Sequence, residues 1–254
     1  MTHTSAVIDP LLWIVLPYAA VVLLIGGLIA RYRADQFGWT SRSSQIYESK
    51  ILRLGSPLFH GGLLLVVGGH VVGLLIPEAW TSKIGISEHT YHWIAVALGS
   101  VSGVLTLAGL AILLFRRITV GAVAKATTHN DVFTFTALIF VLCAGALTTI
   151  IGGIAGGGGG LNNYRATVAP YLRSLFYLHP HLDQIQAAPT EFKVHVALAF
   201  CLFAILPFTR LVHLVSAPVG YLLRPYIVYR SRRTTRAGNR PVRRGWAPVV
   251  GLHK

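Results

Sequence analysis

The chain has few charged residues. Asp, Glu, Lys and Arg make up 12% of its 254 residues, against roughly 25% in soluble proteins. Hydrophobic residues account for 54%. This balance excludes an ordinary soluble globular protein and indicates a membrane protein with short polar connections.

Cysteine is also scarce. The two cysteines, Cys143 and Cys201, each lie inside an apolar run, and the sequence contains neither CxxC nor CxxCH. A zinc site, an iron–sulfur cluster and a haem held by thioether bonds are therefore all disfavoured. We interpret both cysteines as small apolar core residues.

Acidic residues are few, eight against 22 Lys and Arg, which gives a formal net charge of +14. The basic residues lie between apolar blocks and near the C-terminus, not along one amphipathic face. A nucleic-acid-binding protein should carry a basic stripe on a folded domain. The distribution of charge therefore argues against a nucleic-acid partner.

Five apolar runs are long enough to cross a bilayer as helices, which takes about 20 residues. Because the runs are continuous and not alternating, helices are favoured over membrane strands. The sequence predicts an all-α integral membrane bundle over residues 1–222 and a basic cytoplasmic tail over 223–254. The five predicted spans cover residues 11–30, 57–76, 91–115, 132–154 and 194–217.

The basic residues also predict the orientation of the spans. The connections on one side hold Arg31, Arg33, Arg42, Lys50, Arg53, Arg116, Arg117, Lys125 and the ten basic residues from Arg210 to Lys254. The other side holds only Lys83, Arg165, Arg173 and Lys193. Since Lys and Arg accumulate in cytoplasmic loops, we expect the N-terminus outside and the C-terminus in the cytoplasm. No basic residue precedes the first run, so we expect that run to remain as a span and not to be removed as a signal peptide.

The long outer connection, residues 155–193, opens with five consecutive glycines, Gly156 to Gly160. This run lacks the GK[ST] ending of a phosphate loop, so we interpret it as a flexible linker. Residues 168–178 and 180–188 are expected to form short helices at the membrane surface.

Four histidines lie within predicted spans, where ionisable residues are costly and usually functional. His60 and His70 belong to the second span, and His195 and His213 to the fifth. In antiparallel helices, His70 and His195 share the outer level, and His60 and His213 the inner level. Two haems stacked between the second and fifth spans, each held by two histidines, fit this layout.

One distance fits this layout poorly. Ten residues separate His60 from His70 and rise about 15 Å, whereas the eighteen between His195 and His213 rise about 27 Å. A tilt of the fifth helix, or a kink at Pro207, is expected to absorb part of the difference. On a continuous helix, His195 and His213 share one face.

Glycines surround the histidines of the second span. They allow either a flat macrocycle or a neighbouring helix to approach the backbone closely, and the sequence leaves both interpretations open. These glycines are Gly61, Gly62, Gly68, Gly69 and Gly73.

A metal or proton transporter is the main alternative from another functional class, and a structural anchor without cofactor is a further one. A metal transporter would normally add carboxylates inside the spans, because many metals favour oxygen ligands as well as imidazole. Asp131, Glu191 and Glu88 lie instead at predicted span edges or outside.

The sequence resembles the gamma subunit of respiratory nitrate reductase, a cytochrome b membrane anchor, over nearly its whole length. The histidine spacings of ten and eighteen agree with that family. The resemblance is carried by RYRADQFGWTSRSSQ, SPLFHGGLLLVVGGHVVGLL, ISEHTYH, LGSVSGVL, KATTHND and LPFTRLVHLVSAPVGYLLRPYIVYR.

The resemblance implies two haems b, the inner one bound by His60 and His213 and the outer one by His70 and His195. It implies that menaquinol or ubiquinol is oxidised on the outer side of a prokaryotic inner membrane. Electrons then pass to an iron–sulfur beta subunit, and a molybdenum-containing alpha subunit reduces nitrate in the cytoplasm. A cytochrome b anchor of another quinone-linked oxidoreductase is the alternative within this chemistry.

Residues at the outer boundary are candidates for the quinol site. Some family members place a lysine there, but this chain reads SEHTYHW. The candidates are His92 and Tyr91, with Glu88 and His89 nearby and Gly69 leaving room beside His70. A histidine suits proton transfer near neutral pH. At the inner boundary, Arg210 is predicted either to pair with a haem propionate or to act as a positive-inside anchor.

Overall fold

The computed structural model describes residues 8–41, 43–157 and 160–215, and the regular elements within these ranges are all helical. Five helical segments there are long and apolar enough to cross a membrane. This confirms the predicted all-helical, five-span architecture. The segments are Ile8–Ala34, Lys50–Leu75, Glu88–Thr119, His129–Ala155 and Thr190–Phe208.

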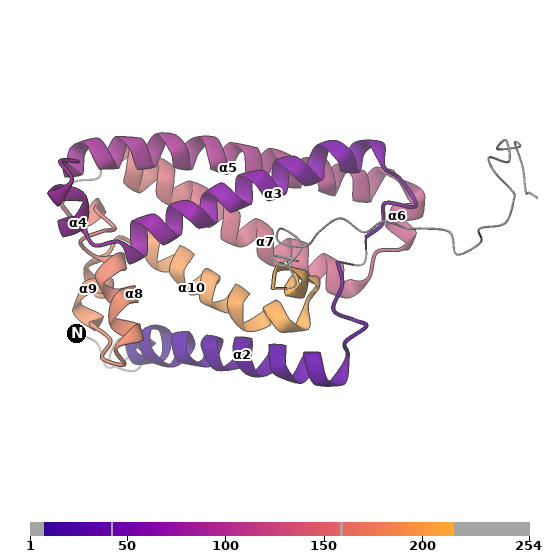
Figure 1. Cartoon of the computed structure of the whole chain (residues 1–254), viewed down its shortest axis with the longest axis horizontal. Helices are drawn as coiled ribbons and strands as arrows, with labels where there is room; N and C mark the ends of the chain where they lie inside the picture. The colour runs from indigo at the N-terminus through magenta and orange to yellow at the C-terminus, as the bar shows by residue number, and fades with distance from the viewer. Residues whose placement is uncertain (1–7, 42, 158–159, 216–254) are drawn as a thin grey trace, which may run out of the picture. The chain divides into compact units, whose positions relative to one another are not determined.

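The long helices run side by side, with short helices at both ends of the bundle (Figure 1). Two spans finish in π-helical turns, η2 and η3, and one begins with such a turn, η1. The elements in the spans are η1 (Leu11–Val15), α2 (Leu16–Ala34), α3 (Lys50–His70), η2 (Val71–Leu75), α5 (Glu88–Thr119), α7 (His129–Leu147), η3 (Thr148–Ala155) and α10 (Thr190–Ile205). The short helices are α4 (Glu78–Lys83), α6 (Gly121–Lys125), η4 (Gly160–Asn162), α8 (Val168–Phe176) and α9 (Leu182–Ala187).

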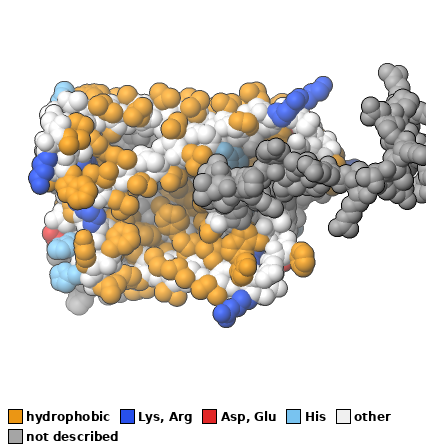
Figure 2. All heavy atoms as spheres, viewed as in Figure 1, with side chains coloured by type: hydrophobic (Ala, Val, Ile, Leu, Met, Phe, Trp, Pro, Cys, Tyr) orange, Lys and Arg blue, Asp and Glu red, His pale blue; other side chains and the backbone are white. Residues whose placement is uncertain are grey.

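Apolar side chains cover the outside of the bundle, and most Lys, Arg and His side chains in view lie towards its ends (Figure 2). Only 17–22% of the most apolar window of each span is buried inside the chain. Such a surface is stable when lipid surrounds it, so the chain is a multi-pass membrane protein. Both Cys143 and Cys201 are exposed on this surface. The expectation that they lie in the core was therefore wrong, because an apolar residue in a membrane protein can face lipid.

Helix starts follow ordinary capping chemistry. The Ser87 hydroxyl accepts a hydrogen bond from the Thr90 amide at the start of α5. Thr128 and Asp131 form a reciprocal capping box at the start of α7. Each pair satisfies backbone amides that a helix leaves without an internal partner.

Glycine brings α3 and α5 into close contact. A Cβ on Gly62 would lie 2.6 Å from the Thr106 amide nitrogen, and one on Gly109 would lie 2.3 Å from that of Phe59. Small residues at these two positions let the two backbones approach, as is common between membrane helices. Gly62 therefore serves helix packing.

The outer connection is packed onto the bundle. Helices α8 and α9 confirm the two short helices predicted over residues 168–178 and 180–188, and Tyr171 of α8 is fully buried. Its hydroxyl donates to the Trp13 carbonyl at 2.8 Å, and the two rings meet edge to face. Ile185 of α9 is buried in the same cluster. These contacts fix the end of the bundle at which α8 and α9 lie.

The fifth span differs from the expected continuous helix over residues 194–217. Helix α10 ends at Ile205 and is followed by one 3₁₀ turn, η5 (Leu206–Phe208). Thr209 is extended, with ψ of 179°, and a second 3₁₀ turn, η6 (Arg210–Leu214), carries His213. Pro207 lies in the break, where its missing amide hydrogen suits an interrupted helix. The predicted tail, residues 223–254, lies outside the described residues.

Candidate functional site

The structure brings the four histidines of the predicted spans together in two pairs, each joining the second predicted span to the fifth. The ring centroids of His60 and His213 are 6.2 Å apart. Those of His70 and His195 are 5.9 Å apart. These are the pairs that the topology predicted.

The break after α10 removes the mismatch in height. On a continuous helix, His213 would lie about 27 Å from His195, too far for His60 on the other span. The 3₁₀ turns and extended Thr209 instead redirect the chain, so that His213 meets His60. His195 and His213 therefore do not reach their partners from the one shared helix face that the sequence predicted.

The spacing within each pair matches two imidazoles that bind one metal atom. An imidazole nitrogen binds a transition metal at about 2.0–2.1 Å and lies about 1.2 Å from the ring centre, so two rings on opposite sides of the metal have centroids about 6.5 Å apart. The observed separations of 6.2 and 5.9 Å are close to that value.

Hydrogen bonds set the tautomer of three of these rings. The Nδ1 of His60 lies 2.8 Å from the Ser56 carbonyl oxygen, and the Nδ1 of His70 lies 2.8 Å from that of Val66. His213 Nδ1 lies 2.5 Å from the Arg210 carbonyl oxygen. A carbonyl only accepts, so Nδ1 must carry the hydrogen and the neutral ring has its lone pair on Nε2. This is the usual arrangement of a metal-binding histidine.

The α3 backbone beside the histidines is open at three glycines. A Cβ on Gly61, Gly68 or Gly69 would meet nothing within 4 Å. Helix α3 packs mainly on α5, whereas α10 packs on α2 and α7. These three glycines favour the macrocycle interpretation. Gly73 does not, because a Cβ there would lie 2.7 Å from the Tyr164 hydroxyl.

A further glycine, Gly145 of α7, contacts the outer pair. A Cβ at this position would lie 2.9 Å from Cε1 of the His195 ring. The ring therefore packs directly on the α7 backbone. Sequence reasoning missed Gly145 because its helix contributes no paired histidine, and no spacing in the sequence links it to His195.

Of the predicted quinol-site residues, Tyr91 lies in a polar cluster at the outer end of α5. Its hydroxyl accepts from the Tyr164 hydroxyl at 3.4 Å, and the Arg165 guanidinium lies 3.9 Å from its ring centroid. Tyr164 in turn packs on Gly73, one helical turn beyond Gly69. The structure thus connects Tyr91 with η2, the turn that follows α3.

The other outer candidates point to different partners. His92 Nε2 donates to the Gly153 carbonyl in η3 at 3.1 Å. His89 Nε2 accepts from the indole of Trp93. Glu88 forms an ion pair of 2.9 Å with Arg165, whose side chain is 2% exposed. His92 and Tyr91 are therefore neighbours in sequence with separate hydrogen-bond partners.

Tyr164 and Arg165 were missed at the sequence level because they lie in the long outer connection, whose path cannot be derived from span topology. Burial, together with the hydrogen bond to Tyr91, raises the pKa of Tyr164 well above its usual range. Its hydroxyl therefore remains a hydrogen-bond donor to Tyr91 at physiological pH.

Comparison with known protein families decides the identity of this bundle. The sequence profile described as nitrate reductase gamma subunit matches residues 9–232. The chain belongs to the nitrate reductase gamma subunit family.

Relatives agree with this family. The chain is 42% identical over 222 residues to the nitrate reductase gamma chain of Bacillus subtilis, covering 87% of this chain and 98% of that one. It is 32% identical over 220 residues to the respiratory nitrate reductase 1 gamma chain of Escherichia coli, covering 85% and 94%. It is also 48% identical over 244 residues to the nitrate reductase-like protein NarX of Mycobacterium tuberculosis. That match covers 96% of this chain but only 37% of the relative's length.

At the end of the bundle where α7 begins, Arg210 is directed towards α7. Its Nε forms an ion pair with the buried Asp131 carboxylate. This pair accounts for the position of Arg210 without a haem propionate, so a propionate contact stays a prediction. Asp131 was predicted only as a span-edge residue, and nothing in its spacing indicated that Arg210 would reach it.

Proposed function

We propose that this gamma subunit binds two haems b, oxidises quinol at its outer side and passes the electrons inward. His60 and His213 would bind the inner iron, and His70 and His195 the outer iron. The two ring pairs, each at the separation of imidazoles on one metal, are the observation that carries the proposal. Bound haem iron would supply one-electron transfer across the membrane.

The number of protein ligands supports a porphyrin over a bare metal ion. The described ranges bring together no group of three or more His, Cys, Asp or Glu side chains. Two imidazoles alone do not complete the coordination of a transition metal held by protein. The remaining donors must then come with the ligand, as they do in a haem. This argument favours an electron-transfer subunit over a histidine-lined metal transporter.

The quinol site is proposed at the outer end of α5, beside Gly69 and the outer histidine pair. Tyr91 suits the binding of a quinol oxygen, because Tyr164 donates to its hydroxyl oxygen and leaves its own hydrogen available to a substrate. His92 suits the proton acceptor, since its Nε2 donates to Gly153 and its Nδ1 then carries a lone pair in the neutral ring.

The direction of electron transfer follows from the different depths of the two histidine pairs in the membrane. With the N-terminus outside, as the basic connections favour, protons are released on the outer side and electrons leave at the cytoplasmic side. The chain would lie in the prokaryotic inner membrane, as its family resemblance implies. Its partners would be an iron–sulfur beta subunit and, beyond it, a molybdenum-containing alpha subunit that reduces nitrate.

The test is a haem count on the purified complex combined with single histidine substitutions. We expect two haems per chain, with a sharp α band on reduction. His60→Ala and His213→Ala should remove the same haem, and His70→Ala and His195→Ala the other. His181→Ala, on the exposed outer connection, is the matched control and should retain both. A single haem in the wild-type protein, or loss of one haem in crossed pairs, would refute the assignment.

A further inference from the structure

Side chains of other spans bind three backbone carbonyls at the break in the fifth span, and one of these, the Thr209 carbonyl, also accepts from the Val212 amide at 3.5 Å. Arg31 of α2 donates to the Pro207 oxygen at 2.6 Å and to the Thr209 oxygen at 3.1 Å. Asn130 of α7 donates to the Phe208 oxygen at 2.9 Å. Within a membrane such carbonyls are costly when unpaired, so these contacts make the break possible.

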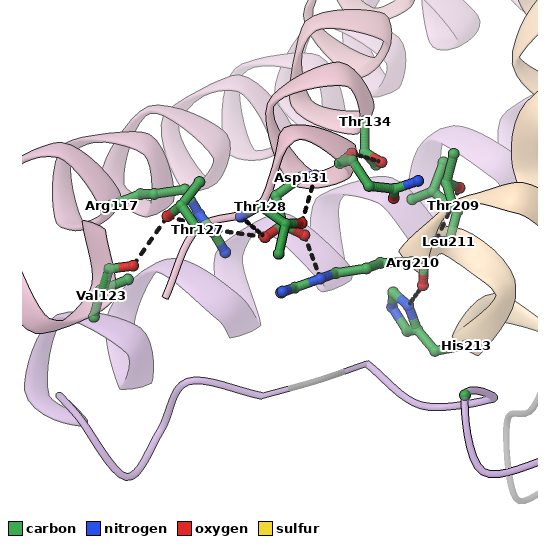
Figure 3. A network of polar contacts seen from close by, with 12 residues as sticks. Arg117, Val123, Thr127, Thr128, Asp131, Thr134, Thr209, Arg210, Leu211 and His213 are labelled. Carbon is green, nitrogen blue, oxygen red and sulfur yellow. Dashed lines mark hydrogen bonds and ion pairs between the residues drawn. The ribbon is translucent and has the colours of Figure 1, made fainter. Parts of the chain in front are cut away.

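The same end of α7 carries Asp131, whose side chain is fully buried. Its Oδ2 accepts from the Thr128 amide at 2.8 Å and from Arg117 Nη1 at 3.3 Å. Its Oδ1 pairs with Arg210 Nε. Figure 3 shows the carboxylate between the two arginines, at the first turn of α7. The helix dipole also favours a negative charge there.

Arg210 connects this carboxylate to the inner histidine pair. Its side chain ends on Asp131, and its backbone oxygen accepts from His213 Nδ1 at 2.5 Å. Both contacts belong to one residue at the start of η6 (Figure 3). When Asp131 holds the Arg210 guanidinium in place, it also holds the Arg210 carbonyl. This carbonyl sets both the tautomer and the direction of the His213 ring.

We propose that Asp131 is a positioning residue for His213 and acts through Arg210. The proposal rests on the proposed function, in which His213 binds the inner haem iron. Without the carboxylate, two neighbouring arginines repel each other at a buried site, and η6 loses its attachment to α7. The His60–His213 pair would then lose its metal-binding separation, whereas the His70–His195 pair lies at the other end of the bundle and would not change.

The experiment compares Asp131→Asn with wild type in the full complex. Asparagine keeps a side-chain oxygen for the Thr128 amide but removes the charge. We expect inner-haem occupancy to fall by at least half, with a changed low-spin EPR signal from the remainder. The signal of the outer haem should be unchanged. Haem content per chain and the two EPR signals are measured on the same preparation.

Two control variants separate positioning from a general effect on α7. Thr128→Ala removes the cap hydroxyl but keeps the Asp131–Arg210 pair, and Arg117→Gln removes the other arginine. Both should retain two haems with wild-type EPR signals. Equal loss of both haems in Asp131→Asn, or loss of the inner haem in Thr128→Ala, would show a folding effect and overturn the proposal.

The proposed function and the positioning role fail in different ways. If His213→Ala retains the inner haem, the ligand assignment itself is wrong. If His213→Ala loses that haem while Asp131→Asn keeps it with an unchanged signal, the ligand assignment stands and the positioning role of Asp131 is refuted.

Discussion

If His70 and His195 bind the outer haem as proposed, enlarging Gly145 should selectively remove it. A Cβ there would lie 2.9 Å from His195 Cε1, while ordinary contacts begin at 3.4 Å. The ring must then move by roughly 0.5 Å, more than the variation of about 0.2 Å that a metal–ligand bond tolerates. Gly145→Ala should therefore weaken the outer haem, and Gly145→Val, with two more methyl groups, should exclude it.

A destabilised α7 helix would not explain the loss of the outer haem in Gly145→Ala. Alanine is favoured over glycine inside a helix by about 1 kcal/mol, so Gly145→Ala should form α7 at least as well as wild type. Gly99→Val on α5 is the matched control, because a Cβ on Gly99 meets nothing within 4 Å. This control variant should keep both haems.

The assay is the reduced-minus-oxidised spectrum with EPR, followed by quinol-dependent nitrate reduction. For Gly145→Val we expect one haem per chain, the inner one, and turnover reduced at least about tenfold, which corresponds to about 1.4 kcal/mol in the barrier. If Gly145→Val shows two haems, a normal outer signal and wild-type turnover, the packing argument for the outer site is wrong.

Three further predictions concern polar contacts outside the haem pairs. Arg165→Gln removes the ion pair with Glu88 and should cost about 2–4 kcal/mol of stability. This is less than for a fully buried pair, because the Glu88 side chain is 29% exposed. Thermal unfolding should show the loss, with both haems retained. Burial alone would raise the pKa of Glu48, but hydrogen bonds from the Ile51 amide and the Arg116 side chain outweigh it and lower the pKa. The stability that Glu48 contributes should therefore be fully present above about pH 4.3, the pKa of an unperturbed Glu, and should be lost as the pH falls through the lower pKa that Glu48 has in the folded protein. Glu48→Gln should abolish this acid dependence of the unfolding temperature. Thr128→Ala should lower stability by about 1 kcal/mol through loss of a helix cap, measured by the same unfolding assay.

The sequence determined the membrane architecture of this protein. Apolar runs of about twenty residues must be helical in lipid, because each backbone amide and carbonyl needs a partner within its own segment. The pairing of His60 with His213 and of His70 with His195 followed from the order of the spans alone. Such deductions succeed because they depend only on chain direction, whereas the fixed rise of a helix predicted a mismatch in height that the break after α10 removes.

Tertiary structure decided how the pairs are built. Pro207 signalled an interruption, but Arg31 and Asn130 set the direction in which the chain leaves the break, and their contacts join residues far apart in sequence. Gly145 and Asp131 likewise became visible only when α7 was placed beside the fifth span. Hydrophobic patterns specify which segments enter the membrane, whereas close contacts and ion pairs between helices depend on how side chains of different spans meet.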